Sequence, residues 1–117
     1  MTETRLEGPF RLTVDEIDSA IGAKTAGTFA IGHVDHLGRF VVQHVGRSDS
    51  DLRAQLRNKI GAEPYFKHLC FGTPKEAFEK ECELFHAFQP PGNFLHPERP
   101  PGTDWKCPCC LVMSFRR

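Results

Sequence analysis

The sequence lacks a run of apolar residues long enough to cross a membrane, and it lacks an excess of either charge. Lys and Arg total 15, as do Asp and Glu, so the formal net charge at pH 7 is zero. Overall charge therefore gives no argument for a nucleic-acid partner, which would require a local basic surface. The first nine residues contain no apolar stretch of signal-peptide length. These absences predict a cytoplasmic protein without a membrane partner.

Tyrosine and tryptophan are also scarce, with one of each against ten phenylalanines. A chain of 117 residues fits a single domain with a small core. Phenylalanine rings bury a large apolar area, so they should supply much of that core.

The cysteines are few but unevenly placed. Three of the five lie within four residues near the end of the chain; the set is Cys70, Cys82, Cys107, Cys109 and Cys110. In a reducing compartment, an odd number with this crowding favours metal binding or free thiols over disulfides.

Hydrophobic patterning predicts an α+β fold with a small antiparallel three-stranded sheet and flanking helices, in the order β-β-α-β-α. The strands are expected at 27–34, 40–45 and 65–71, the first two forming a hairpin. Leu52, Leu56 and Ile60 predict a helix that ends at Gly61, and Thr73 caps a second helix over 74–88.

The regions on either side of this core have a different character. Residues 1–26 should form an N-terminal extension with a short helix, capped by Thr13 and directing Val14, Ile17 and Ile21 inward. Residues 27–88 form the central domain. Residues 89–117 begin with a Pro-rich stretch and should run as a tail over the surface, bringing Trp105 and the cysteine cluster onto the domain.

The second long helix places an acid among apolar residues. Glu81 shares a stripe with Ala77, Leu84 and Phe88. A buried carboxylate is costly unless a cation or a metal pairs with it, or its pKa is raised at a functional site. The alternative is a boundary residue whose carboxylate reaches water.

The first long helix carries several cations. Arg53 and Arg57 lie four residues apart, Lys59 lies on a neighbouring face, and Arg47 precedes the helix. Lys and Arg on one surface supply the sequence-independent part of nucleic-acid affinity, so these four residues are candidate nucleic-acid contacts. The alternative is an ordinary solvated helix face.

The order of these parts resembles the GIY-YIG nuclease domain. Gly27-Thr28-Phe29 opens one strand, His44-Val45-Gly46 closes the next, and a basic helix, a strand and a helix bearing Glu81 follow. In that family the two motif tripeptides lie on adjacent strands. The resemblance covers about residues 27 to 88.

The resemblance implies a divalent-metal-dependent endonuclease, a hydrolase that cleaves phosphodiesters of DNA or RNA. It places Glu81 as the ligand of Mg²⁺ or Mn²⁺. Phe29 and His44 stand at the two motif tyrosines, so His44 becomes the candidate base or donor beside the attacking water. Gln55 falls at the family's arginine position when one residue is inserted after Gly46. These departures imply a divergent, weakened site.

The tail predicts a second metal site. Cys107 and Cys110 form a Cys-x-x-Cys pair, which is half of a zinc site. Cys82 and His86, one helical turn apart, would complete a Cys₃His set, with His96 as a rival ligand. Such an ion would clip the tail to the domain. The alternative is that Cys82 is a core residue, His86 is exposed and the tail thiols are free.

The sequence thus predicts a GIY-YIG-like nucleic-acid-binding domain with a weakened nuclease site. The competing hypothesis is a catalytically inactive interaction module, stabilised by a zinc-clipped tail that presents a surface to a protein partner.

Overall fold

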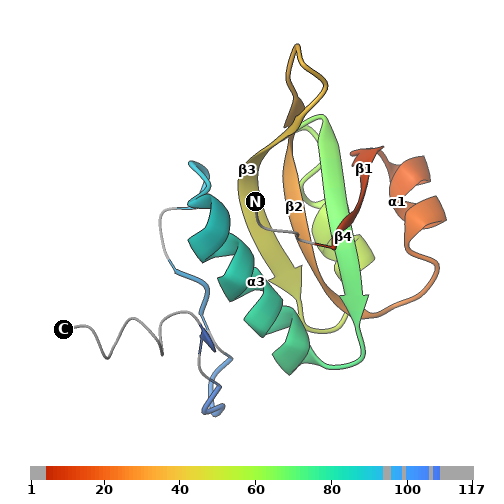
Figure 1. Ribbon diagram of the computed structural model, residues 1–117. Helices are drawn as coiled ribbons and strands as arrows, with labels where there is room; N and C mark the ends of the chain where they lie inside the picture. Colours follow the sequence, from red (N-terminus) through yellow and green to blue (C-terminus); the bar gives the residue numbers. More distant parts are fainter. Residues whose placement is uncertain (1–4, 94–95, 99, 106, 109–117) are drawn as a thin grey trace.

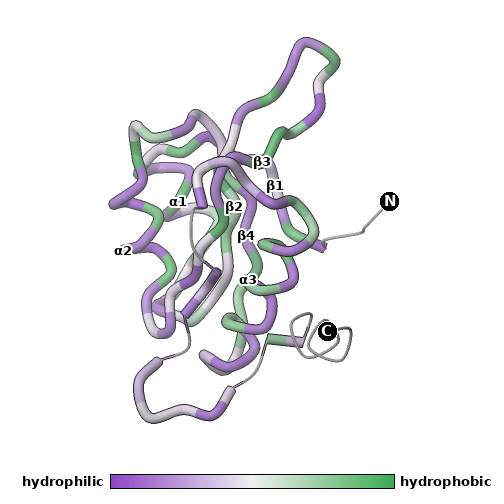
Figure 2. The backbone as a smooth tube through the Cα atoms, turned by 90° about the vertical axis from the view of Figure 1, so that its left-hand side faces the viewer, coloured by the Kyte–Doolittle hydropathy of each residue, from purple (hydrophilic) through white to green (hydrophobic). Residues whose placement is uncertain are grey.

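The computed structural model describes residues 5–93, 96–98, 100–105 and 107–108. It shows an α+β fold in which the helices cover both faces of one antiparallel sheet (Figure 1). Phe29, Ile31 and Phe66 pack with residues of α1 (Val14–Ala20) and α2 (Leu52–Arg57) on one face. Ala30 and Val45 pack against Leu84 of α3 (Pro74–Phe88) on the other. Figure 2 shows α2 and α3 on opposite sides of the strands.

The predicted hairpin is confirmed. β2 (Ala26–Val34) pairs antiparallel with β3 (Phe40–Ser48), and the register shifts once, between Ile31 and Gly32. Its tip, which extends beyond the rest of the sheet in Figures 1 and 2, is closed by Asp35, whose Oδ1 accepts from the N–H groups of Leu37 and Arg39 at 2.9 Å.

The prediction of three strands is wrong, because the sheet has four strands in the order β1-β4-β2-β3. The additional strand, β1 (Glu7–Arg11), pairs antiparallel with β4 (Tyr65–Phe71). β1 is short, contains Gly8 and Pro9, and directs only Phe10 toward the core, where its ring lies 5.5 Å from that of Phe66. An edge strand of this composition has no alternating apolar pattern for a sequence analysis to detect.

The helix caps follow the predicted chemistry. The Thr13 hydroxyl accepts from the Glu16 N–H, and the Thr73 hydroxyl accepts from the Glu76 N–H, both at 3.3 Å. Gln89 then ends α3 in the left-handed conformation at φ 44°.

One predicted core position, Val14, and one predicted helix end, at Gly61, are wrong. Val14 is 49% exposed because it opens α1 at its outer end, whereas Ile17 and Ile21 are buried as expected. Ile60 is 41% exposed because α2 ends at Arg57 and the chain turns before it. A period of four carried past the end of a helix no longer reports which face is buried.

The segment after α3 runs back along the outer side of that helix (Figure 1). Its beginning contacts β3, and Trp105 packs on Phe78 with ring centroids 5.9 Å apart. None of the helices in the described part of the chain is both long and apolar enough to span a bilayer.

Candidate functional site

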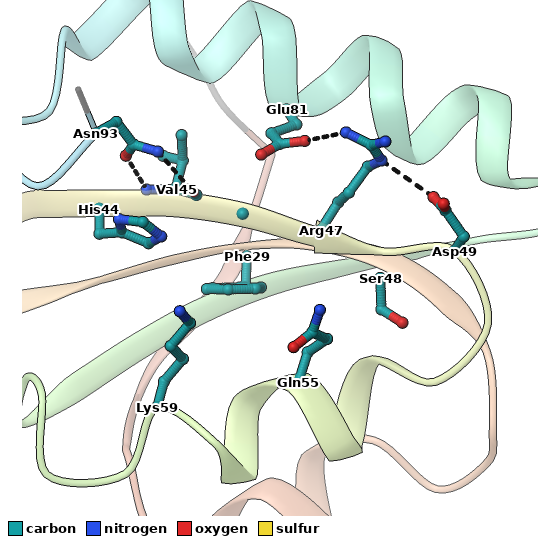
Figure 3. Close-up of a pocket in the computed structure, with 11 residues that line it drawn as sticks. Phe29, His44, Val45, Arg47, Ser48, Asp49, Gln55, Lys59, Glu81 and Asn93 are labelled. Atoms are coloured by element: carbon teal, nitrogen blue, oxygen red, sulfur yellow. Dashed lines mark hydrogen bonds and ion pairs between the residues drawn. The ribbon is translucent and has the colours of Figure 1, made fainter. Parts of the chain in front are cut away.

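A polar cleft of about 390 Å³ bends around the outer edge of β3, between α2 on one side and α3 with the tail on the other (Figure 3). Side chains of β3 alternate between these two sides, so one strand contributes to both walls. The residues that line the cleft are Phe29, His44, Val45, Gly46, Arg47, Ser48, Asp49, Gln55, Lys59, Glu81 and Asn93.

The floor of the cleft on the α2 side is the ring of Phe29, which is almost fully buried. A Cβ on Gly46 would lie 2.5 Å from this ring, so no larger residue fits there without displacing it. Phe29 carries no hydroxyl, and at this point of the cleft it offers an apolar surface only.

Glu81 reaches the cleft from α3 and pairs with Arg47 of β3. Nη1 of Arg47 donates to Oε1 of Glu81 at 2.6 Å, and both side chains are nearly buried, at 13% and 10% exposed. Burial raises the pKa of the Glu81 carboxyl, and the Arg47 guanidinium partly opposes this effect. The charge of the Glu81 carboxylate, which is unfavourable to bury, is therefore compensated by a cation of the protein itself, Arg47.

Arg47 is held by more than this pair. Its Nε donates to Oδ1 of Asp49 at 3.0 Å, its Nη2 donates to the Glu98 carbonyl, and its guanidinium lies 5.0 Å from the ring centroid of Phe78. Two carboxylates, a carbonyl and an aromatic face thus fix one guanidinium, which bridges β3, α3 and the tail.

His44 lies on the opposite side of β3 from Glu81. Its Nδ1 is 3.2 Å from the Gly92 carbonyl oxygen, which can only accept, so Nδ1 carries the proton and Nε2 is the basic nitrogen. Burial lowers the pKa of His44, and the positive charge of nearby Lys59 lowers it further. The hydrogen bond to the Gly92 carbonyl acts in the opposite direction and raises it. The lowered pKa favours the neutral form of the ring, which is able to accept a proton.

The tail completes the cleft through Gly92 and Asn93. The Asn93 side chain accepts from the Val45 N–H at 2.8 Å and donates to the Val45 carbonyl at 3.0 Å. The Gly92 N–H donates to the Gln43 carbonyl at 2.7 Å, and a Cβ on Gly92 would come equally close to that oxygen. Close backbone approach at this point requires glycine.

The four basic candidates separate into two groups. Arg47 and Lys59 line the cleft, and Gln55 points into it beside Lys59. Arg57 instead pairs with Asp18 of α1 at 2.5 Å, and Arg53 lines none of the cleft. The four basic residues therefore do not form one continuous surface around the cleft, because only Arg47 and Lys59 line it.

A second cluster lies where the tail crosses α3. One ligand atom from each of Cys82, His96 and Cys107 lies within 4.8 Å of the other two, and both cysteines are buried. This Cys-His-Cys set is able to bind a metal ion such as zinc. Among the described residues His86 is not part of the set, although its ring lies 5.1 Å from that of His96. Cys109 and Cys110 lie outside the described residues.

Comparisons of this chain with protein-family models, with curated proteins and with solved structures gave no match. The resemblance to the GIY-YIG family therefore stays a prediction, carried by the residues named above.

Sequence reasoning missed the role of Asp49 and the pairing of Arg47 with Glu81. The two members of the pair are 34 residues apart, and no local pattern joins them. The one signal in the sequence was that a buried carboxylate requires a cation nearby, and this signal does not identify the cation. What the site offers chemically is a neutral imidazole, a carboxyl group paired to arginine, and a lysine, around a space large enough for a phosphate group.

Proposed function

We propose that this cleft binds the phosphodiester backbone of nucleic acid and hydrolyses it weakly with a divalent cation. The observation that carries the proposal is the gathering of Lys59, His44 and Glu81 in one cleft from three separate elements. The GIY-YIG resemblance supports the same assignment, since its order of strands and helices brings the corresponding positions together.

Binding would depend mainly on Lys59. The ammonium group of Lys59 points from the α2 side into the cleft, where a phosphate oxygen would accept from it (Figure 3). Arg47 already contacts two carboxylates, Glu81 and Asp49, so much of its charge is compensated. A phosphate that approached Arg47 would have to compete with both.

Hydrolysis would use His44 as the general base. Its Nε2 is able to take a proton from a water in the cleft, because Nδ1–H is engaged by the Gly92 carbonyl. A low pKa keeps this nitrogen unprotonated at neutral pH, so the rate should fall as pH drops through a value below 6.5, the ordinary pKa of histidine.

The second carboxylate oxygen of Glu81 is the candidate ligand for Mg²⁺ or Mn²⁺, since Oε1 is engaged by Arg47. Such ions commonly use only one or two carboxylates, with water and substrate phosphate as the remaining ligands. The ion would polarise the phosphate. Arg47 competes with it for the same carboxylate, which is consistent with weak activity.

Binding is tested with fluorescently labelled single- and double-stranded DNA and RNA, by anisotropy over a series of salt concentrations. Lys59→Met should weaken binding several-fold and flatten the salt dependence. Lys24→Met, which removes the same charge at an exposed position outside the cleft, is the matched control. Equal binding by the two variants would contradict the assignment of the cleft.

Hydrolysis is tested with the same nucleic acids and Mg²⁺ or Mn²⁺. Glu81→Gln and His44→Gln should each reduce cleavage by about 10²-fold or more. Cleavage at wild-type rates by either variant, or no cleavage by any form, would reject the enzyme. Binding without cleavage would leave a nucleic-acid-binding domain.

The competing function is an interaction module with a structural metal. It is favoured by the Cys82, His96 and Cys107 cluster, whose nitrogen and sulfur donors suit Zn²⁺ rather than Mg²⁺. If neither binding nor cleavage of nucleic acid is seen, this function is the one that stands.

A further inference from the structure

We infer that Zn²⁺ bound by Cys82, His96 and Cys107 holds the tail in the position that completes the cleft. The inference concerns a different site from the proposed function and does not depend on nucleic-acid binding.

The geometry of the three donors is close to that of a zinc site. In a tetrahedral site with Zn–S bonds of about 2.3 Å and Zn–N bonds of about 2.0 Å, donor atoms are roughly 3.5–3.8 Å apart. The three donor atoms here lie within 4.8 Å of one another. Small rotations of the side chains would bring them to the required spacing.

The orientation of His96 supports its role as a ligand. Its Nδ1 lies 2.8 Å from the Pro97 carbonyl oxygen, so Nδ1 donates and Nε2 keeps the lone pair that a metal needs. Histidine ligands of metals commonly donate their other ring N–H to a carbonyl in this way. The ring is also packed edge-on against Phe85, with centroids 5.4 Å apart.

The surroundings of the cysteines favour a closed, structural site. Cys82 and Cys107 pack with Phe78, and Trp105 covers this cluster. Structural zinc sites use four protein ligands, whereas catalytic ones leave a position open. The fourth ligand is a prediction from the sequence alone: the Cys-x-x-Cys spacing favours Cys110, which lies outside the described residues.

The consequence for the cleft follows from the path of the tail. Between the end of α3 and His96, the chain supplies Gly92 and Asn93 to β3. Just after His96, the Glu98 carbonyl accepts from Arg47. An ion that fixes His96 to α3 therefore restrains both sets of contacts, because they lie within a few residues of the ligand.

The ligand set is tested by zinc content, measured by mass spectrometry on protein purified without chelators. One Zn²⁺ per chain is expected in the wild type. Cys82→Ala, His96→Ala, Cys107→Ser and Cys110→Ser should each lose most of it, whereas the matched controls His86→Ala, Cys109→Ser and Cys70→Ser should keep it. Zinc well below one per wild-type chain, or retained by Cys107→Ser or His96→Ala, would overturn the site.

The coupling is tested on the wild-type chain, so that misfolded variants do not confuse the result. Zinc is removed with a chelator and then restored, and amide hydrogen exchange is followed by NMR. The Val45 amide, which donates to Asn93, should exchange at least tenfold faster without zinc and recover when zinc returns. The Phe29 amide, in the central strand, serves as the control. If the Val45 amide exchanges at the same rate after zinc is removed, the coupling is overturned, even where the purified wild-type protein contains one zinc per chain.

Substitution by Co²⁺ gives an independent readout of the ligands. Thiolate ligation in a tetrahedral site should produce a sulfur-to-cobalt charge-transfer band and visible absorption, and both should weaken in Cys107→Ser. A spectrum typical of octahedral oxygen ligands would contradict the assignment.

Discussion

Glu81 and Cys82 are consecutive residues of α3, yet they face two regions of opposite character. An α-helix turns by about 100° per residue, so the first reaches the cleft and the second reaches the tail. The cleft is polar and open, and among its charged residues Arg47 pairs with Glu81 and Asp49. The region around Cys82 is buried, aromatic and rich in soft ligands. α3 thus separates an open cleft, which a ligand could enter and leave, from a buried cluster of ligand atoms, which could hold a metal ion permanently.

Phe78 belongs to both regions. One side of its ring receives Arg47, and the ring also packs on Trp105. The two regions are therefore distinct in chemistry but share a support, and substitutions can show how far they are independent.

The largest effect is expected from Phe78→Ala, which should lower the free energy of unfolding by about 4 kcal/mol. The residue is almost fully buried, and its loss removes a contact from Arg47 and from the tail at once. Urea denaturation measures the change, and Phe71→Ala, on a less buried phenylalanine of β4, is the control. A loss no larger than that of the control would show that the two regions do not rest on this ring.

Arg47→Gln should cost about 3 kcal/mol at pH 8, because it leaves the Glu81 carboxylate nearly buried without its cation. Removing Arg47 takes away an interaction that lowers the pKa of Glu81, so this pKa should rise further. A raised folded-state pKa adds stability that is present at low pH and is lost as pH rises through it. The cost should therefore be smaller at pH 5 than at pH 8. Adding Glu81→Gln should remove this pH dependence, and a cost independent of pH in the single variant would contradict the buried charge.

Asn93→Ala should cost about 1–2 kcal/mol, since both hydrogen bonds to Val45 are lost. Asn93→Asp keeps an acceptor for the Val45 N–H, but its ionised carboxylate has no donor for the Val45 carbonyl. At low pH the protonated carboxyl regains an O–H donor, so the stability of this variant should then fall between that of Asn93→Ala and the wild type. Zinc content should be unchanged in both variants, because Asn93 lies on the cleft side of the tail. A loss of zinc would show that the two regions are not separable.

The smallest effect is expected from Lys59→Met on the pKa of His44. Lys59 contributes to lowering this pKa, so its removal should raise the pKa of His44, while burial continues to lower it. NMR titration of the His44 ring measures the value, with Lys24→Met as the control. A fall in the pKa of His44 would contradict the placement of Lys59 beside it.

The sequence was sufficient for the elements that have strong local signals. The hairpin of β2 and β3 and the Thr73 cap of α3 follow from alternation and from capping chemistry. β1 was not detected, because Gly8 and Pro9 interrupt a strand with one inward-facing aromatic. Its place at the edge of the sheet depends on pairing with β4, more than 50 residues away in the chain, and local patterns do not report such pairing.

The candidate sites show the same limit. The apolar stripe around Glu81 indicated that its carboxylate needs a partner, but only the fold identifies Arg47 as that partner. The spacing of Cys82 and His86 indicated a helical ligand pair, whereas the path of the tail brings His96 to Cys82 instead. Periodicity describes one helix well, but the ligand that comes from elsewhere in the chain is set by tertiary packing.

The contacts of Gly92 and Asn93 also bear on how chains of this protein meet one another. β3 is the last strand of the sheet, and the tail forms hydrogen bonds with the Gln43 carbonyl and with both the N–H and the carbonyl of Val45. Open strand edges are templates for pairing with another chain and a common origin of aggregation. The tail therefore covers this edge of the sheet. A chain without the tail would expose these backbone groups of β3, and a strand of another chain could pair with them.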